Sequence, residues 1–163
     1  MIDIEPVTLV FSFVLFGAFT APFIYHSQKN KKKESKLLEK LLEAALSLDS
    51  RIDTQESWRY EYTLGLDSKK GILYYHQNSL EGSPFSFDLK DFKRVSVSKK
   101  MREFQSGTTT KSVLDYISLE LVPKDPKKSI VNLELYDGDK YSDLLGETLI
   151  ADKWADLAKK HLN

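Results

Sequence analysis

An uncharged, apolar segment near the N-terminus is the feature that most constrains this chain. It runs from Val7 to Tyr25, and none of its nineteen residues is charged. Nineteen helical residues span about 28 Å, close to the hydrocarbon thickness of a bilayer. Eleven of them are Val, Leu, Ile or Phe, which together favour insertion by roughly 3–7 kcal/mol. The segment therefore predicts a transmembrane helix, with residues 1–28 as the anchor.

A secretory signal peptide and a buried core helix are the two alternatives to an anchor. A signal peptide has a basic start, a shorter apolar core and a small-residue cleavage site. Here the start is acidic, and the basic residues follow the apolar run. Cleavage after Ala18 or Ala21 is therefore poorly supported. A core helix is disfavoured because several lysines come directly after the segment.

These lysines also predict the orientation of the chain. They are Lys29, Lys31, Lys32 and Lys33. An excess of Lys and Arg beside a membrane helix is retained on the cytoplasmic side. We therefore expect the N-terminus to lie outside, the rest of the chain to be cytoplasmic, and the four lysines to contact the membrane interface. Residues 29–56 are interpreted as a basic stop-transfer segment followed by a linker helix.

Leucines recur at three- and four-residue steps in residues 34–52, with charged residues between them. Such a pattern is typical of an amphipathic helix. The stripe spans under three heptads, which is short for a stable isolated coiled coil. We expect the helix to pack on the chain's own domain; weak dimerisation and contact with a partner helix are the alternatives. The stripe consists of Leu37, Leu38, Leu41, Leu42, Ala45, Leu46 and Leu48.

From Trp58 the apolar period changes to two, which indicates half-buried strands. The aromatic content of 12% also suits a β-rich core. A last helix is predicted near Glu147–Leu162, with Ile150, Trp154, Leu157 and Ala158 on one stripe. A flexible connection is predicted over residues 105–112. The six expected strands cover residues 58–66, 72–77, 85–89, 92–104, 113–123 and 131–135.

This order of about six antiparallel strands and one C-terminal amphipathic helix resembles the bacterial pleckstrin-homology-like domains. The run from Phe87 to Val97 looks like the place where a short strand of those domains passes through a polar turn into the next strand. Residues 62–67 and 71–75 are similar to their opening hairpin. The resemblance implies an α+β fold in which residues 57–163 form a PH-like β-barrel or meander, tethered by the N-terminal transmembrane helix.

The resemblance implies a binding role, since that fold hosts lipid, peptide and protein binding without a common active site. Its phosphoinositide-binding members use basic residues in the first hairpin loop. Lys69 and Lys70 fall in that loop here, so they are candidate contacts for a lipid or a partner. The plainer interpretation is that any exposed turn carries such residues.

No motif indicates catalysis, a cofactor or a metal. The chain has no cysteine, its three histidines are scattered, and its glycines never cluster. The acidic stretch from Asp137 to Glu147 lacks the glycine and the bidentate Glu of a calcium loop. Charge is balanced after residue 52, which does not favour nucleic-acid binding. We expect no enzyme, cofactor, nucleic-acid partner or small-molecule substrate.

The functional hypothesis from the sequence is a non-enzymatic, single-pass membrane-anchored cytoplasmic interaction module. Its expected partners are the bilayer and a protein of unknown identity. One alternative is a small accessory subunit of a larger membrane complex, since Gly17, Ala18 and Ala21 would let another helix approach closely. A second alternative is an inner-leaflet lipid-binding domain.

Overall fold

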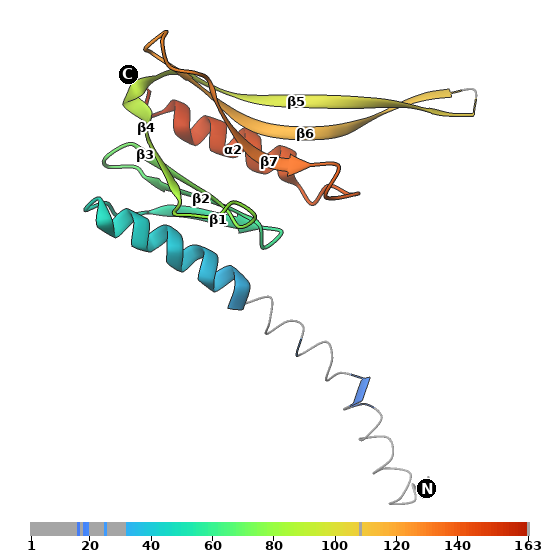
Figure 1. Ribbon diagram of the computed structural model, residues 1–163, viewed down its shortest axis with the longest axis horizontal. Helices are drawn as coiled ribbons and strands as arrows, with labels where there is room; N and C mark the ends of the chain where they lie inside the picture. Colours follow the sequence, from blue (N-terminus) through green and yellow to red (C-terminus); the bar gives the residue numbers. More distant parts are fainter. Residues whose placement is uncertain (1–15, 17, 20–24, 26–31, 108, 163) are drawn as a thin grey trace, which may run out of the picture.

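The computed structural model describes residues 16, 18–19, 25, 32–107 and 109–162. Within them a helix covers residues 32–47, and seven strands, one 3-10 turn and a second helix follow (Figure 1). The elements are β1 (Thr54–Trp58), β2 (Tyr62–Asp67), β3 (Ile72–Gln77), β4 (Phe85–Asp88), η1 (Leu89–Asp91), β5 (Phe92–Ser106), β6 (Thr109–Pro123), β7 (Val131–Asp137) and α2 (Glu147–Lys159).

The strands form two separate antiparallel sheets, in the orders β1-β2-β3-β4 and β5-β6-β7. The predicted six-stranded barrel is therefore wrong: there are seven described strands, and no strand pairing among them closes the two sheets into a barrel. One reason is η1, which Asp88 caps by accepting a hydrogen bond from the N–H of Lys90. This turn ends β4 and leads the chain into the second sheet.

The prediction missed one strand because the chain turns at Arg59 and Tyr60, within the range that was predicted to be a single strand. Both residues adopt left-handed backbone conformations, with φ of 54° and 52°. The N–H of Glu61 donates to the carbonyl of Trp58 across 3.2 Å, so β1 and β2 form a hairpin. Two consecutive left-handed residues define a type I′ turn, which normally carries Asn or Gly. Because neither Asn nor Gly occupies these two positions, the sequence pattern predicted one strand where there are two.

Helix α2 lies between the two sheets and closes the core (Figure 1). Its buried face includes Trp154, whose indole N–H donates to Glu56 of β1 across 2.8 Å. The predicted stripe on this helix is confirmed, with Ile150 and Leu157 packed at its margin. The buried residues of α2 in this core are Ala151, Trp154, Ala155 and Ala158.

The helix over residues 32–47 packs on the opposite face of the first sheet (Figure 1). Leu41 and Ala45 contact Tyr74 there, and Leu37 is also buried. A Cβ atom on Gly65 would lie 2.6 Å from Cδ2 of Leu41, so glycine at that position allows the close approach. Our first expectation, that this helix packs on its own domain, is confirmed.

The predicted membrane anchor is not supported. Among the described residues, no helix is both long enough and apolar enough to cross a bilayer. The helix over residues 32–47 carries seven charged side chains. Most of the segment Val7–Tyr25 lies outside the described residues, as do Lys29 and Lys31. The predicted single-pass localisation, with an outer N-terminus and a cytoplasmic domain, is therefore not supported either.

Asp67 connects the end of this helix to the β2–β3 turn. Its carboxylate accepts hydrogen bonds from the hydroxyl of Ser50 (2.6 Å) and from the backbone N–H groups of Arg51, Lys69 and Lys70 (2.9–3.0 Å). Burial of the carboxylate opposes its ionisation, but these hydrogen bonds outweigh burial and lower the pKa of Asp67 to about 2. The ionised carboxylate therefore stabilises the docked helix.

We expect Leu41→Ala to lower the free energy of unfolding by about 2–4 kcal/mol, because it leaves a cavity under the helix. Leu149→Ala removes the same atoms from an exposed position on α2 and serves as the matched control. Urea unfolding of both variants measures the difference. Equal losses in the two variants would contradict the packing described here.

Asp67 also predicts a pH dependence of stability. Its pKa is lower in the folded chain than in the unfolded chain, so its contribution is present above about pH 4 and is lost as the pH falls toward 2. From pH 5 to 2 the wild type should therefore lose roughly 2 kcal/mol more than Asp67→Asn. Urea unfolding at each pH tests this, with the exposed Asp156→Asn as a control that keeps the wild-type profile.

Candidate functional site

The outer half of the β5–β6 hairpin extends beyond the rest of the described chain (Figure 1). We call it the arm and define it as residues 101–106 and 109–114. Its strands pair only with each other, from Met101 opposite Leu114 to Ser106 opposite Thr109. Since β7 pairs with β6 only between Tyr116 and Leu121, both edges of the arm are unpaired among the described residues.

The β6 edge becomes free where the chain leaves β7. The N–H of Gly138 donates to the carbonyl of Asp115 across 2.7 Å, directly after the end of β7. A Cβ atom on Gly138 would lie 2.9 Å from that carbonyl oxygen, so only glycine fits this approach without a shift. Beyond this hydrogen bond the chain turns away toward α2. The edge from Thr109 to Leu114 is thus left open in line with β7.

The arm and its base are basic. Residues 99–114 contain four Lys or Arg residues and one Glu, a net charge of +3. Met101 and Val113 add exposed apolar surface between the charges. The Nζ of Lys100 lies 5.4 Å from the ring centre of Tyr116, within the range of a cation–π contact. The basic residues are Lys99, Lys100, Arg102 and Lys111.

Arg102 attaches the arm to the loop between β7 and α2. One nitrogen, Nη2, lies 2.8 Å from the carboxylate of Asp115 and 2.6 Å from that of Asp139. The hydrogen bond to Asp139 is the main reason why the pKa of Arg102 is raised. Arg102 therefore remains charged and holds the base of the arm in place.

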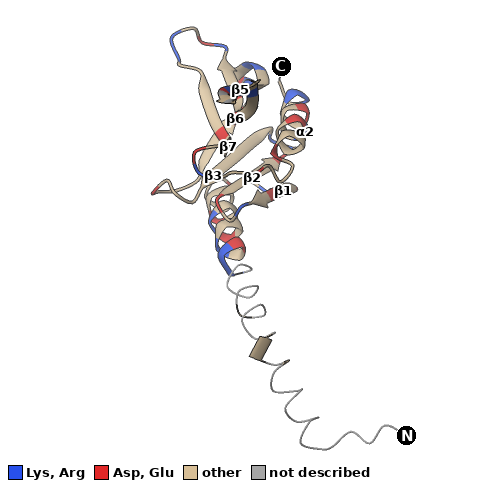
Figure 2. Cartoon of the chain, turned by 90° about the vertical axis from the view of Figure 1, so that its right-hand side faces the viewer, with Lys and Arg blue, Asp and Glu red and all other residues tan. Residues whose placement is uncertain are grey.

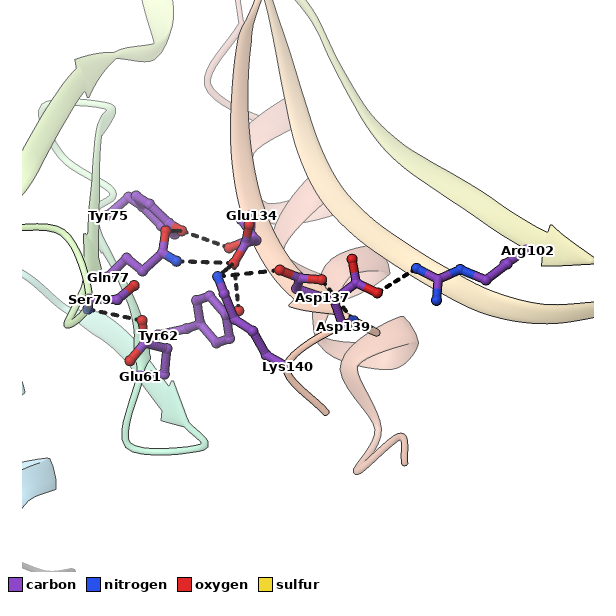
Figure 3. A network of polar contacts seen from close by, with 10 residues as sticks. All are labelled: Glu61, Tyr62, Tyr75, Gln77, Ser79, Arg102, Glu134, Asp137, Asp139 and Lys140. Atoms are coloured by element: carbon purple, nitrogen blue, oxygen red, sulfur yellow. Dashed lines mark hydrogen bonds and ion pairs between the residues drawn. The ribbon is translucent and has the colours of Figure 1, made fainter. Parts of the chain in front are cut away.

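A polar network continues from this loop to the first sheet (Figure 3). At its centre, Oε1 of Glu134 accepts hydrogen bonds from Tyr62 (2.8 Å), Gln77 (3.0 Å) and Lys140 (2.7 Å). The hydroxyl of Tyr75 donates to the backbone carbonyl of Glu134 across 2.7 Å. Side chains from β2, β3 and the loop after β7 thus converge on Glu134 of β7. These contacts fix β7, the strand in line with the open edge of the arm.

The charges of this network are consistent with a structural role. Hydrogen bonding to Glu134 raises the pKa of Lys140. Burial, reinforced by the hydrogen bond to Glu134, raises the pKa of Tyr62 far above its ordinary value. Tyr62 therefore stays neutral and Lys140 stays charged at physiological pH. Neither group is available as a general base.

Arg59 holds the other end of the loop. Its guanidinium pairs with the buried carboxylate of Glu147 and with Asp143, and its Cζ lies 4.3 Å from the ring centre of Tyr141. Burial lowers the pKa of Arg59, but the hydrogen bonds and negative charges of Glu147 and Asp143 together outweigh burial, and the net shift is upward. The β1–β2 turn and the start of α2 therefore fix the loop that carries Asp139.

Those of the predicted lysines that the structure describes lie away from the arm. Lys32 and Lys33 are exposed on the helix over residues 32–47. Lys69 and Lys70 lie in the β2–β3 turn, where Nζ of Lys70 donates to the carbonyls of residues 48 and 49. Lys70 thus caps the end of that helix. Whether Lys69 and Lys70 contact a lipid or a partner stays a prediction.

The sequence did not indicate the arm as a site. Residues 92–104 were correctly predicted to be a strand, but residues 105–112 were interpreted as a flexible connection. The cluster from Lys99 to Arg102 at the end of a strand was the available signal. Comparison with protein-family models, curated proteins and solved structures gives no match.

We expect Arg102→Ala to loosen the arm, because it removes both ion pairs at the base. Amide hydrogen exchange of residues 109–114 should become about two- to fivefold faster, because solvent-exposed ion pairs contribute only modestly to local stability. Lys111→Ala is the control, since Lys111 forms no ion pair with another described residue. Equal acceleration in both variants would contradict the role of Arg102.

Proposed function

We propose that the protein is a non-enzymatic protein-interaction module whose arm binds an acidic, extended segment of a partner. The segment adds as a third strand along the β6 edge, from Thr109 to Leu114. The observation that carries this proposal is a basic two-stranded ribbon whose edges are unpaired within the described chain.

The backbone supports strand addition. An unpaired edge presents a row of N–H and C=O groups that another chain can pair with. A two-stranded ribbon is marginally stable in water, and a third strand stabilises it. The base of the arm is fixed by Arg102 and by the contacts around Glu134, so the edge is held in line with β7. Little ordering of this base is needed on binding.

The charge of the arm favours an acidic partner. Lys99 is paired with Asp152, and Arg102 is paired with Asp115 and Asp139. Lys100 and Lys111 form no ion pair with another described residue, so these two lysines are the charges that attract acidic segments. Exposed Met101 and Val113 offer apolar contacts to alternate side chains of the added strand. An acidic strand with alternating apolar residues therefore fits best.

The resemblance to PH-like domains remains part of this proposal. It is supported by the order of seven antiparallel strands followed by one C-terminal helix. It receives no support from barrel closure, because the two sheets are separate. A role as an accessory subunit is the second candidate, since the same edge would also serve in a permanent assembly.

A capped octapeptide of alternating Glu and Val residues tests the proposal with the full-length protein at low ionic strength. We expect calorimetric binding that weakens about tenfold, or roughly 1.4 kcal/mol, in Lys100→Glu/Lys111→Glu. NMR shifts on binding should concentrate at residues 109–114. A peptide methylated on alternate backbone nitrogens should bind more weakly, because it lacks the donors that pair with β6.

The matched control is Lys127→Glu/Lys128→Glu, which reverses two exposed charges in the β6–β7 turn at the other end of the hairpin. This variant should bind the peptide like the wild type. The proposal fails if both double variants lose affinity equally, if the shifts centre on Lys69 and Lys70, or if backbone methylation has no effect.

A further inference from the structure

The helix over residues 32–47 has a second apolar stripe that its own sheet does not cover. Leu42 is 41% exposed and Leu46 is 74% exposed, whereas Leu41 and Ala45 beside them are buried. Leu38, one turn earlier, is half-buried. Residues four apart lie above one another on a helix, so these three leucines form one line. We call Leu38, Leu42 and Leu46 the ridge.

A groove runs beside the ridge. It is lined by Leu42, Ala45, Leu46 and residues 49–52, and it has a volume of 510 Å³. A groove next to a line of leucines is the surface into which side chains of another helix pack. Contiguous exposed apolar surface of this kind is typical of an interface.

Some of the charges on the helix are spaced in a way that does not help the isolated helix. Lys32, Lys36 and Lys40 follow one another at steps of four, and so do Glu39 and Glu43. Figure 2 shows that both basic and acidic residues lie on this helix. Like charges four residues apart destabilise a helix. None of Lys36, Glu39, Lys40 and Glu43 forms an ion pair with a side chain in the described part of the chain. These charges are available to something outside the monomer.

The two halves of the helix carry opposite charge. Residues 32–40 hold four lysines and two glutamates, a net +2, and residues 41–50 hold Glu43 and Asp49, a net −2. Two such helices placed antiparallel oppose +2 with −2 at both ends. Placed in parallel, they oppose like with like. The helix dipoles favour the antiparallel arrangement as well.

We infer that the ridge is a self-association surface, on which the same helix of a second copy of this chain docks antiparallel about a two-fold axis. A two-fold interface uses one patch on both copies, so the patch must complement itself. The ridge and the charges beside it meet this condition. The inference is independent of the arm and goes beyond the proposed function.

The arrangement specifies a register. If Leu38 of one copy lies opposite Leu42 of the second, then Lys36 lies within one residue of the level of Glu43 along the paired helices, at the flank of the interface. The two-fold axis gives this arrangement twice. The same register sets Ser35 within one residue of Leu46 of the second copy. Ser35 of one copy and Ser35 of the other are then about ten residues apart, or about 15 Å along the axis.

Single cysteines test the register cleanly, because the natural chain has none. Full-length Ser35→Cys and Leu46→Cys proteins with tags of different size are mixed and oxidised. We expect the mixed disulfide between the two variants to form at least several times faster than either homodisulfide. Leu149→Cys, exposed on α2, measures random collision. Homodisulfides that form as fast as the mixed one, or no excess over Cys at position 149, would overturn the inference.

A charge exchange supplies a second readout. Lys36→Glu and Glu43→Lys should each weaken self-association of the full-length chain about three- to tenfold, and the double variant should restore it. Lys36→Glu replaces two like pairs four residues apart by opposite pairs, and Glu43→Lys replaces one, while each change also makes one like pair three residues apart. Neither change is therefore expected to unfold the helix. Association that stays weak in the double variant would refute antiparallel docking.

Discussion

The buried ion pair between Arg59 and Glu147 is the interaction on which much of this architecture depends. It offsets the left-handed backbone of Arg59 and Tyr60, which costs of order 1 kcal/mol or more at each residue. It also joins the β1–β2 turn to the first turn of α2. Loss of one partner alone would leave a buried charge uncompensated, at a cost of about 3–5 kcal/mol. The aromatic rings of Tyr136 and Tyr141 complete its surroundings.

From this ion pair the order of the site follows step by step. Arg59 fixes Asp143 and the loop after β7, and Asp139 in that loop holds Arg102. Arg102 in turn sets the base of the arm. The candidate binding edge is therefore positioned by residues far away in the sequence, since Arg59 lies 43 residues before Arg102 and Asp139 lies 37 residues after it. A change at Arg59 would reach the arm without contacting it.

The sequence predicted those parts of the fold that local patterns determine. The apolar stripe of α2 around Trp154 was correctly interpreted, since that helix buries one face. The alternation correctly indicated strands at β2 and β3, but these strands are buried on both faces and not half-buried, because the helix over residues 32–47 covers the second face of their sheet. The leucine-rich helix was correctly expected to pack on its own domain. In each case the periodicity of one element contained the information.

The sequence could not predict what distant contacts determine. The Arg59–Tyr60 turn lacks Asn and Gly, so its conformation depends on Glu147, 88 residues later. Residues 105–112 were assigned to a flexible connection because Gly107 and three threonines lie there, yet pairing with β5 makes residues 109–112 a strand. The sequence did not predict the open edge of β6, because this edge depends on where the pairing with β7 ends. Sheet closure is likewise a long-range property, and the expectation of a barrel was wrong.

The face under the helix over residues 32–47 has a physical consequence of its own. Three buried polar atoms there find no hydrogen-bond partner among the described residues: Oγ1 of Thr63, Oη of Tyr74 and Nε2 of His76. Burial is the main cause that lowers the pKa of His76, and the nearby positive charge of Lys40 is the second. Both keep the imidazole neutral. Between the polar contacts at its two ends, helix docking therefore relies on the apolar contacts of Leu41 and its neighbours. A helix held in this way gains from a second copy that covers its remaining leucines.

The ridge and the arm belong to different layers of the molecule. The ridge lies on the helix that covers the first sheet, and the arm projects from the second sheet (Figures 1 and 2). Association through the ridge would therefore leave both arms free. Two arms held in one assembly turn the second binding event into an intramolecular one, which raises avidity without any new contact. Weak strand addition at each arm is then sufficient for firm attachment to a partner that carries two acidic segments.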